Sequence, residues 1–466
     1  MPGTSGHGGA AAAGGAGGVI GAGGATGGSG GTVASGAPDA GMPGKPDASS
    51  ADASDASAEP AAVVSNETLT NLLVMGYQGW FTAPTLPPAM TNWVHWSNGP
   101  TPGKGNVQVD GWPDLQEFTP AELIDTNFHF PDNSVAQLYS AYNEATVVRH
   151  MKWAKDYGID GVFLQRFLVA TQAYDPVFGE FVDKVAQNIV KGAEQHGRVF
   201  AIEYDLSGAH EPDFVVQVEN DWKHLVDDLK VTASDRYLQH RGKPLLILWG
   251  LGFTDRPGTP AQANALIDWL TQTAPPQYRV TLAGGVPTHW RELNGDSKTD
   301  PAWGAVYRRF DVIHPWMVGR FKDDAGAANF RKTLIEPDLA EAKKVGADYL
   351  PVVFPGFSWA NLMKDPTKFN QIPRRGGVFW WKQLYEYQSA GCNMIFGAMF
   401  DEVDEGTAMF KMAATAAQAP VEEKFLTLDT DGLSLPSDFY LQLAGAGTRM
   451  LHGEIPLSAT IPADVK

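Results

Sequence analysis

Eight short apolar segments recur along the chain from residue 74 onward, and longer segments with helical periodicity separate them. Strands and helices that alternate in this way form parallel sheets covered by helices. Eight is the number of strands that a closed (β/α)8 barrel requires. We therefore predict an α/β fold built on a (β/α)8 barrel of the TIM type. The predicted strands cover residues 74–81, 161–167, 199–206, 244–251, 280–285, 312–318, 349–357 and 394–400.

The segments between these strands have the periodicity of helices. Four of them end on a glycine shortly before a strand, namely Gly158, Gly197, Gly346 and Gly391. A glycine at this position takes the left-handed conformation that ends a helix, so the punctuation agrees with the barrel. The predicted helices cover residues 135–157, 182–196, 261–273, 329–345, 378–389 and 408–417.

Composition divides the chain into three parts. Residues 1–63 consist almost entirely of Gly, Ala, Ser, Pro, Thr and Asp and contain no aromatic residue, so we expect a disordered tether. Residues 64–420 hold the barrel, and an insertion over residues 82–133, rich in Pro, Gly and Trp, follows its first strand. Long structured loops of this kind usually line binding sites. We expect residues 421–466 to form an appendage on the barrel, with strand-like and turn-like pieces at 424–428 and 439–443.

The overall composition excludes several classes of partner. A formal net charge of -18 makes nucleic acid and anionic membranes poor partners, whereas an uncharged carbohydrate is compatible with it. Cys392 is the single cysteine, so the chain can form no intrachain disulfide and no cysteine-rich metal site, and we expect this residue to be buried. No apolar run reaches the roughly 18 residues that a membrane-spanning helix needs.

The N-terminal segment bears on cellular location. It lacks the basic region and the apolar region of a signal peptide. Its Gly, Ala, Ser and Pro content resembles the flexible tethers that follow a lipoprotein or secretion signal in bacteria. We therefore expect a secreted or surface-tethered protein whose signal is not visible in this sequence. The alternative is a cytoplasmic protein with an unused tail.

Four carboxylates stand within five residues at the end of the last predicted strand, namely Asp401, Glu402, Asp404 and Glu405. The carboxyl ends of the strands are where an α/β barrel carries its active site. Crowded carboxylates repel one another, so we expect one of them to keep its proton above the usual pH. Glu402 and Glu405 are three residues apart, which favours the separation of about 5–5.5 Å that a retaining glycosidase needs. We predict that these two glutamates are catalytic.

Two other interpretations of the acidic block stay open at this point. The carboxylates could cap a helix that begins near Gly406, because acidic groups favour the N-terminus of a helix. They could also form a calcium loop, but the spacing lacks the alternating Asp or Asn ligands and the central glycine of an EF-hand. We predict no metal and no cofactor, since no zinc, phosphate-loop or dinucleotide motif occurs.

Side chains at the ends of the other strands form a set typical of a sugar site. Pyranose rings offer apolar faces to aromatic rings and hydroxyls to polar groups. We expect Tyr77, Gln165, Glu203, His314 and Glu402 to open onto one cleft. Each lone His or Trp could instead belong to the core, and Glu203 and Asp205 could pair with Arg166 as a structural ion pair. The predicted substrate-binding residues are Tyr77, Trp80, His95, Trp96, Gln165, Arg166, Glu203, Asp205, Trp249, His289, Trp290, His314, Trp316 and Asp401.

Four motifs stand out between about residues 74 and 417. They are Gly76-Tyr-Gln-Gly-Trp-Phe81, Trp93-Val-His-Trp96, Tyr157-Gly-Ile-Asp-Gly-Val-Phe-Leu-Gln-Arg-Phe167 and Met399-Phe-Asp-Glu-Val-Asp-Glu-Gly-Thr407. Together they resemble bacterial proteins related to glycoside hydrolase families 99 and 71. This subgroup is often described as xylosidase-like or arabinosidase-like.

The resemblance implies a mechanism. Family 99 contains endo-α-mannosidases and endo-α-mannanases, retaining (β/α)8 enzymes whose Asn-Glu-Trp-His-Glu-Gly motif places its two catalytic glutamates on Glu402 and Glu405. It implies that Glu402 deprotonates the 2-hydroxyl of the sugar to give a 1,2-anhydro sugar, and that Glu405 protonates the leaving oxygen and then activates water. This chain departs from the motif at Asp401, Val403 and Asp404, so the resemblance does not fix mannose as the sugar. Related family 71 enzymes cut α-1,3-glucan.

The leading hypothesis is a retaining glycoside hydrolase that acts on an α-linked polysaccharide or oligosaccharide. A second hypothesis is a glycan-binding surface protein on a barrel that has lost catalysis. An open cleft that holds both glutamates favours the first, and a plugged barrel mouth favours the second. A third hypothesis, a metal-dependent hydrolase, requires three acidic or histidine ligands that converge on one point.

Overall fold

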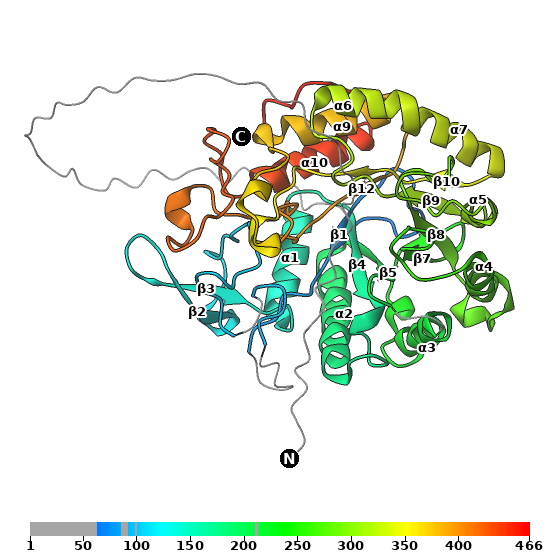
Figure 1. The fold of residues 1–466 in the computed structure, drawn as a ribbon, viewed down its shortest axis with the longest axis horizontal. Helices are drawn as coiled ribbons and strands as arrows, with labels where there is room; N and C mark the ends of the chain where they lie inside the picture. Colours follow the sequence, from blue (N-terminus) through cyan, green and yellow to red (C-terminus); the bar gives the residue numbers. More distant parts are fainter. Residues whose placement is uncertain (1–62, 85–91, 98–99, 210–212) are drawn as a thin grey trace, which may run out of the picture.

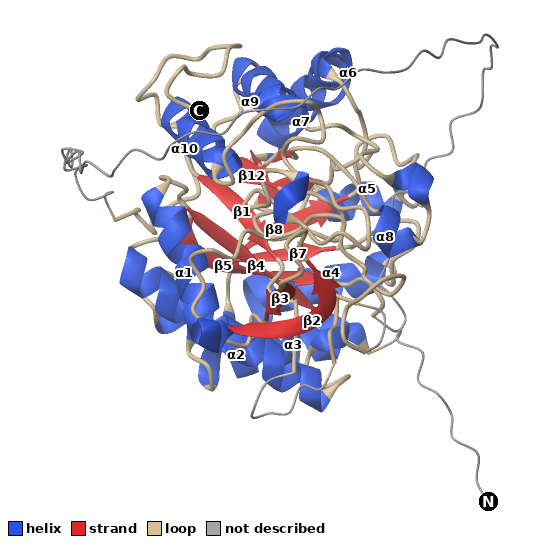
Figure 2. Ribbon diagram, turned by 90° about the vertical axis from the view of Figure 1, so that its left-hand side faces the viewer, coloured by secondary structure: helices blue, strands red, loops and turns tan. Residues whose placement is uncertain are grey.

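Parallel strands occupy the middle of the molecule and helices cover them on the outside (Figures 1 and 2). The computed structural model describes residues 63–84, 92–97, 100–209 and 213–466. The strands follow the order β10-β9-β8-β7-β5-β4-β1-β12-β11. Their bounds are β1 Leu73–Tyr77, β4 Gly161–Phe167, β5 Val199–Asp205, β7 Lys243–Trp249, β8 Thr281–Val286, β9 Val312–Pro315, β10 Asp348–Tyr349, β11 Val352–Val353 and β12 Ile395–Gly397.

The two ends of this order are two pieces of one extended segment, which closes the barrel. β10 pairs with β9, and β11 pairs with β12. Between them, the backbone N–H of Leu350 donates to the carbonyl of Ile313 at 2.9 Å, and that of Phe396 donates to the carbonyl of Pro351 at 3.0 Å. Pro351 has no N–H, which interrupts the ladder at this point. The predicted barrel is confirmed: seven of the eight predicted segments each hold one barrel strand, and the segment predicted at 349–357 holds two short ones, β10 and β11.

Helices follow most strands and lie against their outer face. Helix α2 shows why they begin and end where they do. The Asp175 side chain accepts hydrogen bonds from the backbone N–H of Val177 and Phe178, and the helix ends at Gly197 in the left-handed conformation with φ 62°. All four predicted terminal glycines have positive φ. The helices are α1 Glu144–Asp156, α2 Pro176–His196, α3 Phe214–Asp227, α4 Pro260–Asp268, α5 Ala302–Tyr307, α6 Asp324–Phe330, α7 Glu336–Val345, α8 Ala360–Met363, α9 Val378–Ser389 and α10 Phe439–Leu451.

The insertion after β1 contains a hairpin that the sequence did not predict. Strand β2, Leu123–His129, pairs antiparallel with β3, Val135–Tyr139, apart from the barrel strands. The predicted helix over 135–157 is therefore wrong in its first part, and α1 begins only after Asn143, whose side chain caps it. The pairing partner of β3 lies within the predicted insertion, so helical periodicity within 135–139 alone was misleading.

Two further predictions of secondary structure are wrong. Residues 408–417 form no α-helix; the chain there runs beside the insertion, with the backbone N–H of Ala413 donating to the carbonyl of Trp112 at 2.9 Å. The segment 439–443 is the start of helix α10. Gly445 of α10 lies so close to the carbonyl oxygen of Tyr157 that a Cβ there would be 1.8 Å from it, which explains the glycine. Helix α10 thus packs directly on the end of α1.

The remaining expectations concern the single cysteine, membrane-spanning helices and the division of the chain into three parts. Cys392 is buried and free, as predicted. No helix of the described residues is both long and apolar enough to cross a membrane. The predicted tether over residues 1–63 lies outside the described residues except for Val63. The domain boundaries at 64, 420 and 421 stay predictions.

Candidate active site

The loop that follows β12 carries the carboxylate cluster, which we define as Asp401, Glu402, Asp404 and Glu405. The predicted helix cap at Gly406 is wrong, because no helix begins there. Instead, the chain folds back on itself, and the backbone N–H groups of Thr407 and Ala408 both donate to the carbonyl of Glu402, at 3.1 and 2.8 Å. The carboxylates therefore have no structural role at a helix end.

Neighbouring segments hold the backbone of this loop from outside. The N–H groups of Asp110 and Gly111, in the insertion, donate to the carbonyl of Val403 at 3.0 and 2.9 Å. The N–H of Ser358 donates to the carbonyl of Glu405 at 2.9 Å. The guanidinium of Arg374 donates to the carbonyl of Gly406 at 2.8 Å. Sequence reasoning missed Asp110, Ser358 and Arg374, because each is far from the loop along the chain.

Asp401 ties the end of β12 to the end of β1. Its two carboxylate oxygens accept from the backbone N–H groups of Gln78 and Gly79, at 2.7 and 2.9 Å. Burial raises the pKa of Asp401 to about 7. Both oxygens already have backbone donors, so this geometry makes Asp401 a residue that positions the loop and does not support its predicted substrate contact.

Glu402 and Glu405 have different surroundings. Glu402 is buried and accepts from the Gln78 amide at 3.0 Å and from the Thr407 hydroxyl at 2.7 Å. No side chain of the described residues donates to Glu405, which is partly accessible to solvent. Burial, and next the charge of Glu405, raise the pKa of Glu402 well above its usual range. Burial and then the charge of Asp404 raise the pKa of Glu405 to about 8. The two glutamates therefore titrate as a pair, one fixed and one free.

Beside this pair, Asp404 holds a histidine of the insertion. The Nδ1 atom of His95 lies 3.0 Å from Oδ2 of Asp404. The imidazole stacks on the indole of Trp80, with ring centroids 3.7 Å apart and planes 5° from parallel. His95 therefore covers one face of Trp80, so that this face cannot serve as a platform for a sugar.

A second polar group lies inside the barrel, across β4, β5 and β9. The Gln165 amide donates to Oε2 of Glu203 at 2.6 Å. His314 donates from Nδ1 to the carbonyl of Leu350 at 2.8 Å. Its Nε2 has no hydrogen-bond partner in the described part of the chain and lies 3.9 Å from Oε1 of Glu203. Burial raises the pKa of Glu203 to about 8 and lowers the pKa of His314 to about 4. Both side chains are therefore neutral at pH 7.

The remaining predicted residues on this side of the barrel belong to β5, β7 and the loops after β8 and β9. Trp249 meets Trp316 edge to face, with centroids 5.5 Å apart, and its indole N–H has no partner. Asp205 accepts from the backbone N–H of Ser207 at 2.6 Å, and burial raises its pKa to about 6. His289 is partly exposed. All four are aromatic or polar side chains, and their contact with a sugar stays a prediction.

Four predicted site residues are buried against other parts of the protein, and two of them lie on strands. The hydroxyl of Tyr77 is hydrogen-bonded to His150 of α1 at 2.8 Å. Arg166 pairs with Asp183 of α2 at 2.7 Å and with Asp221 of α3 at 2.6 Å. Successive residues of a strand point to opposite faces, so Arg166 points outward where Gln165 points inward. The single cleft predicted to include Tyr77, and the ion pair between Arg166 and Glu203 or Asp205, are both wrong.

The other two residues are tryptophans in the core. Trp96 is fully buried, and its indole donates to the carbonyl of Tyr139 at 2.9 Å. Trp290 is fully buried, and its indole donates to Asp338 of α7 at 3.1 Å. Both were predicted to bind substrate, and both predictions are wrong, because each ring has its N–H and its faces occupied by protein.

No group of three or more His, Cys, Asp or Glu side chains among the described residues is arranged to hold a metal ion.

A hollow of about 470 Å³ lies beside the β2–β3 hairpin and the segment 413–418. None of the predicted site residues lines it, so it is separate from the carboxylate cluster.

Comparisons with known proteins place this geometry on a known fold. No protein-family model matches the sequence, and no curated protein matches it. The family 99 endo-α-mannosidase of Bacteroides thetaiotaomicron superimposes with a TM-score of 0.59 at 12% identity, over 84% of this chain and 100% of the mannosidase. This chain has the fold of a family 99 glycoside hydrolase. A structure of that mannosidase with bis-tris propane gives a TM-score of 0.59 at 13% identity, over 83% of this chain and 99% of the other.

Proposed function

We propose that this protein is a retaining glycoside hydrolase that acts on an α-linked polysaccharide or oligosaccharide. The observation that carries the proposal is the contrast between Glu402, held by two hydrogen bonds, and Glu405, to which no side chain of the described residues donates. The pair lies at the carboxyl end of a barrel strand, where barrels of this type carry out catalysis. The shared fold with a family 99 enzyme supports the same class of reaction.

The two environments suit two roles. Glu405, protonated near neutral pH and partly accessible, donates its proton to the glycosidic oxygen as the bond breaks and later takes a proton from the attacking water. Glu402 is aimed by Gln78 and Thr407 at the sugar and removes the proton of its 2-hydroxyl, whose oxygen attacks the anomeric carbon. Water, deprotonated by Glu405, then attacks the anomeric carbon of the resulting 1,2-anhydro sugar while Glu402 returns its proton to the 2-oxygen, with net retention of configuration.

Other residues would hold the glycan. The Trp249 and Trp316 rings, the polar group of Gln165, Glu203 and His314, and the side chains of Asp205 and His289 are proposed to bind it. A polar ligand also provides partners for buried atoms such as the indole N–H of Trp249 and Nε2 of His314. A polymeric substrate agrees with a secreted or surface-tethered enzyme, which we propose as the location.

Hydrolysis by purified protein tests the proposal. A panel of α-glucans, α-mannans, arabinans and xylans, with product analysis, identifies the substrate. Glu402→Gln and Glu405→Gln should each lower kcat at least about a hundredfold, a loss of roughly 2.7 kcal/mol of transition-state stabilisation. Glu422→Gln, a change at a glutamate paired with His129 in the exposed part of the insertion, serves as control and should keep full activity. Inverted product stereochemistry, or normal turnover by Glu405→Gln, would falsify this mechanism.

The pH dependence provides a second test. Because the pKa of Glu405 is about 8 and the acid must be protonated, kcat/KM should fall as pH rises through about 8. The profile reports the pair as a whole and not one residue. Activity that stays constant up to pH 10 is the outcome that contradicts an acid role for Glu405.

A non-catalytic glycan-binding protein is the second candidate. It is favoured by the pKa of Glu402, which burial raises well above its usual range and so disfavours the ionised form that a base requires. A binder retains a glycan without cleaving it, and its Glu402→Gln variant binds as well as the original. Release of reducing ends from any member of the panel excludes this candidate.

A further inference from the structure

The insertion after β1 delivers one imidazole, His95, to the carboxylate cluster. The ring is fixed in two ways. Trp80 stacks against its face at 3.7 Å, which sets the plane of the ring. Asp404 lies 3.0 Å from Nδ1, which sets the rotation of the ring within that plane. The direction of the second ring nitrogen, Nε2, is therefore determined by protein contacts.

The chemistry of these contacts leaves Nε2 available. An ionised carboxylate only accepts hydrogen bonds, so Nδ1 of His95 carries the hydrogen. Nε2 has no partner among the described residues, and 24% of the His95 side chain is exposed, against 2% for Asp404. Oδ1 of Asp404 is buried, and none of the described residues donates a hydrogen bond to it. Burying a carboxylate that has one oxygen unpaired costs free energy of folding. This cost indicates that Asp404 is present to position His95.

The backbone conformation of His95 is also typical of a functional site. Its φ of 64° lies in the left-handed region, which a residue other than glycine adopts only with strain. Strain of this kind persists where the surrounding structure imposes it, and it is common at functional sites. The contacts with Trp80 and Asp404 are the interactions that offset it.

We propose that His95 contacts the glycan through Nε2, and that Asp404 and Trp80 are positioning residues that aim it. This inference rests on the proposed hydrolase function. Asp404, which holds the imidazole, immediately precedes Glu405 in the carboxylate cluster, and its charge acts on the Glu405 carboxyl. Nε2 therefore binds a hydroxyl of a sugar that adjoins the cleaved bond. Trp80 supports this histidine and does not itself stack on the substrate.

A purely structural role for His95 predicts a different result from two matched variants. The amide nitrogen of asparagine lies near the position of Nδ1, and that of glutamine lies near the position of Nε2. His95→Asn thus keeps the contact with Asp404 and loses the contact with substrate, whereas His95→Gln does the opposite. A substrate contact makes His95→Gln the more active variant. A structural strut makes His95→Asn the more active and the more stable one.

The experiment measures kcat and KM of the whole purified chain on the member of the polysaccharide panel that it cleaves fastest. His95→Asn should lower kcat/KM about tenfold or more, the effect of one lost hydrogen bond to a substrate. His95→Gln should recover part of that loss. The control is His129→Asn, because His129 also pairs with a carboxylate, Glu422, at 2.9 Å but lies at the end of β2. It should leave both constants unchanged.

The outcomes separate this inference from the function on which it rests. Equal activity of His95→Asn and the original chain, or a higher activity of His95→Asn than of His95→Gln, overturns the inference alone. Normal turnover by Glu405→Gln overturns the proposed catalytic pair, whatever His95 does. A chain that cleaves no member of the panel overturns both. Melting temperatures of the two His95 variants, measured alongside, show whether either change acts through folding.

Discussion

Glu405 combines its proposed role with a cost to stability. Burial raises its pKa to about 8 from 4.5, so the folded chain holds the proton more tightly than the unfolded chain. The contribution to stability is therefore complete below pH 4.5 and is lost as pH rises through about 8. Glu405→Gln carries a neutral amide at every pH. Urea unfolding at pH 5 and at pH 9 measures how far the free energy of unfolding drops between the two pH values. The drop should be smaller for Glu405→Gln than for the original chain, and equal drops would contradict the raised pKa of this carboxyl.

At the scale of elements, one histidine attaches helix α10 to the barrel. Nε2 of His452, at the end of α10, lies 3.2 Å from Asp160, whose same oxygen accepts from the backbone N–H of Leu73 at the start of β1. The hydrogen bond to Asp160 raises the pKa of His452 to about 9. Because the folded pKa is raised, this stabilisation is complete below about pH 6.5 and is lost as pH rises through 9. Limited proteolysis should therefore cut α10 faster at pH 9 than at pH 6.

The matched variant for this prediction is His452→Gln, which keeps a hydrogen-bonding amide but does not titrate. Its cleavage within α10 should depend less on pH than that of the original chain. His129→Gln changes a histidine on the insertion and should behave as the original does. A pH dependence that survives in His452→Gln would assign the effect to another group.

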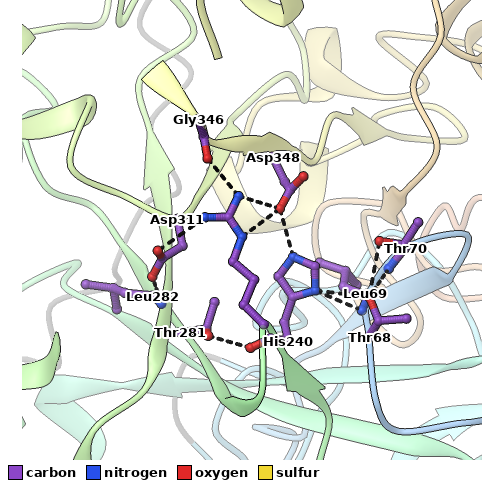
Figure 3. A network of polar contacts seen from close by, with 10 residues as sticks. Thr68, Leu69, Thr70, His240, Thr281, Leu282, Asp311, Gly346 and Asp348 are labelled. Carbon is purple, nitrogen blue, oxygen red and sulfur yellow. Dashed lines mark hydrogen bonds and ion pairs between the residues drawn. The ribbon is translucent and has the colours of Figure 1, made fainter. Parts of the chain in front are cut away.

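At the scale of the whole molecule, a polar network connects the amino-terminal ends of several barrel strands (Figure 3). Asp348 begins β10 and Arg241 precedes β7, whereas the carboxylate cluster follows the carboxyl end of β12, so the two lie at opposite ends of the barrel. Arg241 donates to Asp348 at 2.7 Å and contacts Asp311 at 3.4 Å. His240 joins the same carboxylate through Nε2 at 3.0 Å, while its Nδ1 accepts from the backbone N–H of Leu69. The network thereby links four segments that are distant along the chain, around Leu69, His240, Asp311 and Asp348. Asp348→Asn should lower the free energy of unfolding by about 1 kcal/mol, since the groups are partly exposed, and should leave kcat unchanged.

Denaturant unfolding and steady-state kinetics of this variant check the expectation together. Asp235→Asn is a suitable control, because Asp235 pairs with Arg236 but is 82% exposed, and it should change neither quantity. A loss of turnover by Asp348→Asn without a loss of stability would show that the two ends of the barrel are coupled.

The sequence by itself determined the barrel and the position of the catalytic candidates. Strands that are buried on both faces consist of continuous apolar residues, and helices commonly end at a glycine in the left-handed conformation. Both signals can be recognised in a short stretch of sequence. Strand β4, Gly161–Phe167, and helix α9, Val378–Ser389, have the predicted bounds for this reason. Glu402 and Glu405 follow from the same logic, because an acidic block directly after a strand lies at the carboxyl end of the barrel.

Only the tertiary structure decided which way side chains point and what holds them. Tyr77 and Arg166 face the helices because the register of neighbouring strands sets which residues point inward, and a single sequence does not reveal that register. The partners of the carboxylate cluster could not be predicted either, because they are distant along the chain. Gln78 is hydrogen-bonded to Glu402, 324 positions away, and His95 contacts Asp404, 309 positions away. Contacts between distant segments form only when the barrel closes, which is why the environment of each carboxylate could not be predicted from the residues beside it.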